Sequence, residues 1–154
     1  MRHLFPTTTR SAVFCRPCCR LTQNTIIPTQ LLHVLCYSVI TSGEFAHRGS
    51  VENLIGNRTE LLEKVSLEKH VSAQTPPAFL WASDNDPSVP CQNSIMFRDA
   101  LEESGVKNQI HIYRSDFHGL SLGTLEVMNP KKPFKANVSD WPERADKFLQ
   151  SVFG

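Results

Sequence analysis

Strand-like segments alternate along this chain with segments that have the periodicity of helices. The strand-like segments cover residues 33–40, 78–81 and 109–113, and the helical ones cover residues 51–54, 59–65, 92–104 and 141–153. The first group is rich in β-branched and aromatic residues, whereas the second repeats apolar residues every three or four positions. Strands that alternate with helices form a parallel sheet, because each helix returns the chain to the start of the next strand. The sequence therefore predicts an α/β fold with about three parallel strands and crossover helices.

The last two helices carry recognisable end signals and apolar faces. Gly105 follows residues 92–104 at the position where a left-handed residue commonly closes a helix. Pro142 suits the first turn of residues 141–153. The apolar faces consist of Phe97, Ala100 and Leu101 in the first helix and of Trp141, Ala145, Phe148, Leu149 and Val152 in the second. We expect both faces to pack against the sheet.

The composition excludes several classes of protein. The chain has 154 residues, the size of one domain, of which 40% are hydrophobic and 20% are charged, with a net charge of +1. Nucleic-acid binders and proteins of acidic membrane surfaces need a basic excess that is missing here. No apolar run approaches the roughly 20 residues that cross a bilayer. We therefore expect no nucleic-acid or membrane partner, and, without a clear signal peptide, a cytoplasmic location by default.

The first residues differ in composition from the remainder. Residues 1–43 contain no Asp or Glu, and four arginines fall within their first half. Three interpretations remain open: a product of a late start codon or shifted reading frame, a targeting segment, or an ordered but atypical segment. We expect residues 1–31 to be disordered or foreign to the fold and residues 32–154 to form a partial domain.

The five cysteines do not form a recognisable metal site. Cys15, Cys18 and Cys19 cluster, whereas Cys36 and Cys91 stand alone. A structural zinc site needs four ligands, usually two spaced pairs, and the second pair is missing. We therefore expect incidental thiols and no metal or other cofactor.

An acid and a histidine follow the second and third strand-like segments. Asp86 comes shortly after residues 78–81, and His118 shortly after residues 109–113. The carboxyl ends of parallel strands share one edge of the sheet, where active residues of such folds lie. Each residue alone also has a structural interpretation, Asp86 as a turn former before a proline and His118 as an ordinary loop histidine. Together they match the order of the last two members of a Ser, Asp, His triad.

Several segments resemble the α/β-hydrolase superfamily, and within it the acetyl-esterase branch often labelled acetylxylan esterase, which is related to dienelactone hydrolase and prolyl oligopeptidase domains. The matching segments are residues 36–50, 65–71, 75–81, 86–94 and 118–123. They correspond to the C-terminal half of such an enzyme and its last three sheet strands. The resemblance implies that Asp86 is the triad acid and His118 the base, that no cofactor is needed, and that the intact enzyme deacetylates sugar esters or small esters.

The chain departs from this family at the nucleophile. No Gly-x-Ser-x-Gly motif lies upstream of residue 32, and the family's oxyanion-hole motif is also missing. Gly119-Leu-Ser-Leu-Gly123 fits the motif by letter, but Ser121 follows His118 and does not lie between a strand and a helix. We therefore expect Ser121 to be a loop residue, and we expect the chain to be a truncated or frame-disrupted esterase that is inactive alone.

Two alternatives to a truncated esterase remain. The chain can be a non-catalytic interaction half, which pairs through an exposed sheet edge with a separately encoded N-terminal half or with itself. It can also be a small complete hydrolase with another nucleophile, for which Cys36, Cys91 and Ser121 are the candidates.

Overall fold

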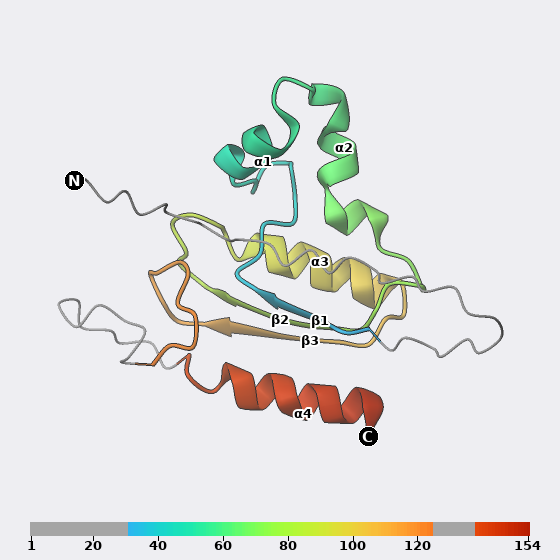
Figure 1. Ribbon diagram of the computed structural model, residues 1–154, viewed down its shortest axis with the longest axis vertical. Helices are drawn as coiled ribbons and strands as arrows, with labels where there is room; N and C mark the ends of the chain where they lie inside the picture. The colour runs from blue at the N-terminus through green and yellow to red at the C-terminus, as the bar shows by residue number, and fades with distance from the viewer. Residues whose placement is uncertain (1–30, 125–137) are drawn as a thin grey trace, which may run out of the picture.

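The computed structural model describes residues 31–124 and 138–154, in which helices cover both faces of a small sheet (Figure 1). The sheet consists of β1 (His33–Cys36), β2 (Ala78–Ser83) and β3 (Asn108–Tyr113), in that spatial order. Both neighbouring pairs are parallel. The predicted α/β fold with three parallel strands is confirmed.

The central strand β2 is the most deeply buried element. Its residues Ala78 to Ser83 all have exposed fractions of 1% or less. Because side chains alternate along a strand, Leu80 joins a core cluster on one face and Trp81 a second cluster on the other. A strand that is covered on both faces has to be apolar on both, which is why residues 78–82 carry no polar side chain.

Helix α3 (Gln92–Glu103) packs on one face of the sheet and α4 (Trp141–Phe153) on the other (Figure 1). Phe97, Leu101 and Phe148 are buried in the two interfaces, as the apolar patterns predict. The predicted bounds of α4 are confirmed, and Gly105 adopts a left-handed φ of 68° just beyond α3. None of the helices within the described residues has the length and apolar character required to cross a bilayer.

Leu149 departs from the prediction for α4. Its side chain remains 42% exposed, although it belongs to the predicted apolar stripe. The apolar stripe of α4 is wider than the area of contact between α4 and the sheet, so Leu149 lies at the margin of that contact.

The first strand is shorter than the sequence predicts. We expected a strand over residues 33–40, but β1 ends at Cys36 because Tyr37 has a φ of 41°. This left-handed conformation is rare for a residue with a large side chain and breaks the extended backbone. The buried Asn93 side chain instead satisfies the backbone N–H groups of Ile40 and Thr41.

The segment between β1 and β2 is helical, with bounds that differ from the prediction. Helix α1 (Arg48–Ile55) begins earlier because the ring of His47 accepts a hydrogen bond from the Ser50 N–H at its start. Three short helices follow: η1 (Thr59–Leu61), α2 (Leu62–Val65) and η2 (Leu67–His70). The predicted helix over 59–65 is therefore present as η1 followed by α2, whereas η2 was not predicted.

Most of the N-terminal segment predicted to be atypical, residues 1–31, lies outside the described residues. Cys15, Cys18 and Cys19 belong to that part of the chain as well. The boundary between this segment and the domain therefore stays a prediction.

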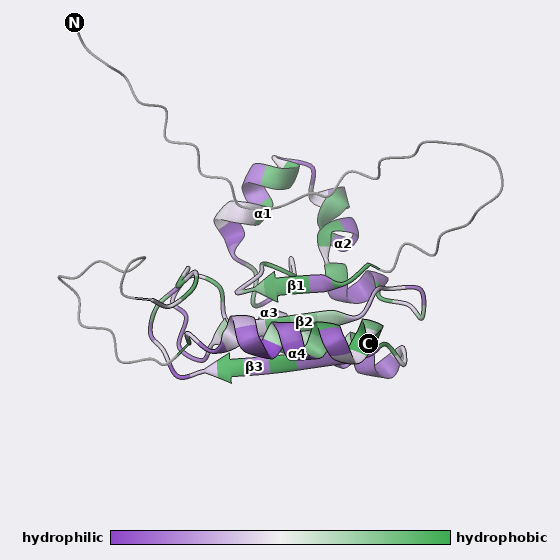
Figure 2. Ribbon diagram, turned by 60° about the horizontal axis from the view of Figure 1, so that its bottom comes forward, coloured by the Kyte–Doolittle hydropathy of each residue, from purple (hydrophilic) through white to green (hydrophobic). Residues whose placement is uncertain are grey.

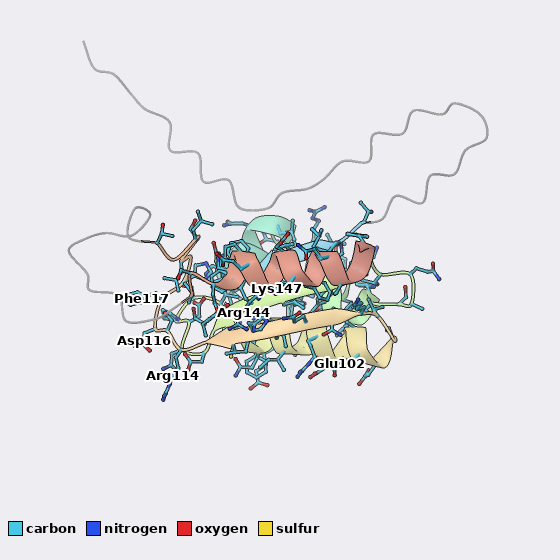
Figure 3. All side chains as sticks on the ribbon, turned by 90° about the horizontal axis from the view of Figure 1, so that it is seen from below. Glu102, Arg114, Asp116, Phe117, Arg144 and Lys147 are labelled. Carbon is cyan, nitrogen blue, oxygen red and sulfur yellow. The ribbon has the colours of Figure 1, made fainter. Side chains whose placement is uncertain are left out.

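Asp140 connects β3 to α4. The Tyr113 hydroxyl donates to Asp140 Oδ1 at 2.7 Å, and Arg144, which projects from α4 (Figure 3), donates to Oδ2 at 2.6 Å. The hydrogen bond from Tyr113, helped by Arg144, holds the pKa of Asp140 below its usual range. A carboxyl group whose pKa is lower in the folded than in the unfolded state stabilises the fold at pH values above its unfolded pKa. This stabilisation disappears as the pH falls through the folded pKa.

We expect Tyr113→Phe to lower the melting temperature at neutral pH and to have less effect in acid. The loss at neutral pH is expected to be about 0.5–1 kcal/mol, because the Asp140 carboxylate is partly exposed. Thermal melts of both proteins across the acid range measure the difference. Asp140→Asn is the control, since Tyr113→Phe added to it should show no further dependence on pH. A melting difference that stays constant with pH would contradict this assignment.

Candidate active site

The loops after β2 and β3 run side by side at the carboxyl edge of the sheet. The backbone N–H of Asp84 donates to the Tyr113 carbonyl at 2.9 Å, and the Asp84 side chain accepts from the Ser115 N–H at 2.8 Å. Asn85 Nδ2 donates to Asp116 Oδ1 at 3.0 Å. Figure 3 shows Asp116 in the loop that follows β3. These bonds fix the two loops to each other and bring Asp86 and His118 together.

The carboxylate of Asp86 makes two different kinds of contact. Oδ1 accepts hydrogen bonds from the N–H groups of Ser88, at 2.8 Å, and Val89, at 2.9 Å. Oδ2 lies 2.7 Å from Nδ1 of His118. The side chain has no exposed surface. Asp86 is therefore the turn former that its position before Pro87 suggests and also the partner of the histidine, with one oxygen for each.

The contact with Asp86 determines which nitrogen of His118 carries a proton. An ionised carboxylate only accepts hydrogen bonds, so Nδ1 has to be the donor. In the neutral imidazole the lone pair then belongs to Nε2, which has no hydrogen-bond partner within residues 31–124 and 138–154. The side chain is 35% exposed. The partly exposed ring of His118 thus has a lone pair on Nε2 that is free to accept a proton, while its other nitrogen is held by a buried acid.

Tyr37 and Trp81 form an aromatic wall beside His118. The rings of Tyr37 and His118 have centroids 5.0 Å apart and are inclined by 73°, and those of Tyr37 and Trp81 are also 5.0 Å apart, inclined by 83°. Burial raises the pKa of the Tyr37 hydroxyl, which therefore stays protonated at neutral pH. No pattern in the sequence indicates that Tyr37 lies beside His118, because it belongs to the predicted strand over residues 33–40.

Ser121 lies in a turn of the loop that follows His118. Its φ is 52°, and its carbonyl accepts a hydrogen bond from the indole of Trp141 at 2.8 Å. Gly123 has a φ of 64°, and a Cβ atom there would collide with Val138. The glycines of this Gly-x-Ser-x-Gly match thus allow a turn of the backbone and its close approach to Val138. Ser121 does not lie at a junction between a strand and a helix.

The remaining candidate nucleophiles are the half-buried thiol of Cys36 and the buried thiol of Cys91. Burial raises the pKa of both Cys36 and Cys91, so neither is a reactive thiolate at neutral pH. Over the described ranges, 31–124 and 138–154, no group of three His, Cys, Asp or Glu side chains could hold a metal ion. Among the described residues, the candidate site therefore consists of Asp86, His118 and the aromatic wall of Tyr37 and Trp81.

The sequence and the fold are similar to those of known hydrolases. Residues 32–141 match the model of the prolyl oligopeptidase family. A segment of 98 residues, 62% of this chain, is 41% identical to endo-1,4-beta-xylanase B of Butyrivibrio fibrisolvens and covers 15% of that protein.

Two solved structures with similar folds are esterases or related hydrolases. The acetyl ester-xyloside bifunctional hydrolase of Caldicellulosiruptor lactoaceticus is 38% identical, with a TM-score of 0.68, over 79% of this chain and 42% of that one. A carboxylesterase of Lactobacillus plantarum is 28% identical, with a TM-score of 0.66, over 78% of this chain and 44% of that one. The chain thus spans less than half the length of each of these structures.

Proposed function

This chain belongs to the prolyl oligopeptidase family of α/β hydrolases, and from this membership we propose that it carries the acid and the base of an ester-hydrolysing triad. Asp86 is the acid and His118 is the base. One observation carries the proposal: the buried Asp86 carboxylate lies 2.7 Å from Nδ1 of a histidine whose side chain is 35% exposed. The order of the two residues along the chain is that of α/β-hydrolase triads.

In this proposal the two residues serve a serine that another segment supplies. His118 Nε2 takes the proton of the serine hydroxyl as its oxygen attacks the ester carbonyl, and Asp86 stabilises the imidazolium that forms. The imidazolium then gives the proton to the departing alcohol, which leaves an acyl-serine. A water molecule, deprotonated by the same nitrogen, releases the acid and restores the serine.

The proposed substrate is an acylated carbohydrate, and acetyl is the proposed acyl group. Support comes from the names of the relatives, which include an acetyl ester-xyloside bifunctional hydrolase, a xylanase and a carboxylesterase. The proposal involves no cofactor, since triad chemistry requires only protein groups and water.

We expect the 154-residue chain alone not to hydrolyse p-nitrophenyl acetate above the rate of an equal concentration of imidazole. Without a serine at His118 no acyl-enzyme forms, and the loss of even one oxyanion-hole donor costs about 10²–10³ in rate. The release of p-nitrophenol by the purified protein measures this. Turnover at enzyme-like rates that His118→Ala abolishes would contradict the requirement for a serine from another segment.

A hybrid protein tests the proposed function directly. Residues 32–154 of this chain replace the matching C-terminal segment of the Caldicellulosiruptor lactoaceticus hydrolase, so that the remainder of that enzyme supplies the missing half of the site. We expect the hybrid to release acetate from acetylated xylosides. The same enzyme without its C-terminal segment is the control. A folded hybrid without esterase activity would refute the function proposed for Asp86 and His118.

Ser121→Ala is expected to leave the esterase activity of this hybrid within about twofold of the unsubstituted hybrid. Its hydroxyl has no role in the proposed triad, and the loop contact with Trp141 uses the Ser121 backbone carbonyl, which the substitution retains. Initial rates on p-nitrophenyl acetate measure the effect. Complete loss of activity would identify Ser121 as the nucleophile and overturn the assignment.

The second candidate function is that of a non-catalytic interaction half. Within the described residues, β1 pairs with β2 on one side and with no strand on the other, and Val34 is 43% exposed. Figure 2 shows β1 as a largely hydrophobic strand at this edge. Leu31, two residues before β1, is 54% exposed. An edge with these properties favours pairing with another half-sheet or with a second copy.

Sedimentation of the purified chain tests this second candidate. Concentration-dependent association that Val34→Lys abolishes would support pairing through β1. A monodisperse monomer that melts cooperatively would argue against it.

A further inference from the structure

Tyr37 occupies an unusual backbone conformation next to the base of the proposed triad. Its N–H still donates to the Trp81 carbonyl at 2.7 Å, which extends the ladder between β1 and β2 by one bond. The φ of 41° then turns the chain out of the strand. Only one other residue apart from glycine, Ser121, has a positive φ within residues 31–124 and 138–154, and it belongs to the loop that carries His118. Such conformations cost free energy and concentrate at functional sites.

The turn at Tyr37 changes the face of the sheet on which its side chain lies. Along a regular strand, residue 37 would follow Leu35 into the core under α3, since side chains alternate. Instead Tyr37 packs with Cys36 and Trp81 in the cluster on the α4 side of the sheet. The left-handed residue thus places two consecutive side chains on one face, and the second of them reaches His118.

A single hydrogen bond does not orient an imidazole ring completely. The contact of Nδ1 with Asp86 Oδ2 is one bond, and rotation of the 35% exposed imidazole about its Cβ–Cγ bond would break it. The Tyr37 ring, inclined by 73° to the imidazole at 5.0 Å between centroids, blocks that rotation. Tyr37 is itself held by Trp81, whose side chain is fully buried. The aromatic wall therefore keeps the imidazole in the plane in which Nδ1 meets Asp86.

We propose that Tyr37 is a positioning residue that fixes the plane of the His118 imidazole and hence the direction in which Nε2 faces. This inference rests on the function proposed for the pair of Asp86 and His118. The aromatic ring is the active part of Tyr37, since the contact is made by its ring.

Nitrogen NMR of His118 in the full 154-residue chain tests the proposal without any need for catalysis. In mildly alkaline solution, correlations within the neutral ring report which nitrogen carries the proton. We expect the wild-type chain and Tyr37→Phe to show His118 protonated at Nδ1, with through-space contacts to ring 37. Tyr37→Leu should lose this single form and give a mixture of the two tautomers, because the ring no longer keeps Nδ1 on Asp86.

Tyr113→Leu is the matched control. Tyr113 also meets Trp81 edge-on, with ring centroids 5.7 Å apart, and it is the only other tyrosine of the chain. Its replacement removes a comparable contact with the same indole and should leave the His118 tautomer unchanged. If Tyr37→Leu does not fold, as judged from its amide spectrum, Tyr37→Met replaces it, since the unbranched side chain fills the space without a ring.

Three outcomes would overturn the proposal: a wild-type tautomer in the folded variant without a ring, an equal disturbance by Tyr113→Leu, or an equal disturbance by Tyr37→Phe. In the hybrid enzyme the ring-deleting variant should lower kcat by about 10- to 100-fold with little change in KM. An inactive hybrid would refute the proposed function alone, because the NMR result on the chain still decides the role of Tyr37.

Discussion

Replacement of Asn93 by Leu is expected to remove a large part of the stability of this domain. The Asn93 side chain is fully buried at the start of α3. Its oxygen accepts from the backbone N–H groups of Ile40, at 2.9 Å, and Thr41, at 3.0 Å. Its nitrogen donates to the carbonyls of Phe45, at 2.8 Å, and Pro90, at 3.0 Å. One amide thus satisfies four backbone groups from two loops.

Leucine has the same number and branching of side-chain heavy atoms but can form none of these side-chain hydrogen bonds, and within the described residues only the Pro90 carbonyl keeps another partner, the backbone N–H of residue 93. Each buried donor or acceptor without a partner costs about 1–3 kcal/mol, so the two buried N–H groups of Ile40 and Thr41 alone should cost about 2–6 kcal/mol. Since domains of this size are stable by about 5–15 kcal/mol, this loss is a large part of the total free energy of unfolding. Urea unfolding followed by the fluorescence of the buried Trp81 measures the free energy of unfolding.

Gln92→Leu is the control for this substitution. Gln92 is exposed and precedes Asn93 in the same helix, so the change in helix propensity and side-chain type is similar. We expect its effect to stay within about 0.5 kcal/mol. Equal destabilisation by the two substitutions would show that the amide of Asn93 is not the source of the stability.

Local patterns in the sequence are sufficient to predict the main layers of the fold. The helix at 141–153 carries both its first-turn proline and an apolar stripe, and the structure reproduces its bounds. The parallel order of the strands follows from their alternation with helices. The predicted end of β1 was wrong. The β-branched and aromatic residues at 33–40 contain no local signal for the turn at Tyr37. That turn depends on contacts with Trp81 and on the bonds from Asn93, which are distant in the sequence.

The candidate site was only partly predictable for the same reason. Asp86 and His118 stand out because each follows a strand-like segment in a chain order known from triads, and the structure brings them to 2.7 Å. Tyr37 was missed, because no motif distinguishes an aromatic residue in a strand from one beside the proposed base. The two roles of Asp86 were predicted as alternatives, but the separate contacts of its two oxygens allow both.

Substitution of either member of the proposed pair is expected to reduce the esterase activity of the hybrid by about 10³–10⁴-fold. His118→Ala removes the group that accepts the serine proton. Asp86→Asn keeps the shape of the acid but presents an amide N–H to Nδ1, which favours the imidazole tautomer protonated at Nε2. That tautomer has no lone pair for the serine proton, so kcat should fall while KM changes little.

Initial rates on p-nitrophenyl acetate over a range of concentrations separate kcat from KM for both variants. Asp99→Asn, an equivalent change on the exposed side of α3, should leave both constants unchanged. Because Asp86 Oδ1 also caps the turn at Ser88 and Val89, each variant needs a thermal melt beside its rates. A loss of activity that merely follows the loss of folded protein would make Asp86 a turn residue only. A loss in fully folded protein, with an unchanged KM, is expected only if the carboxylate acts through His118.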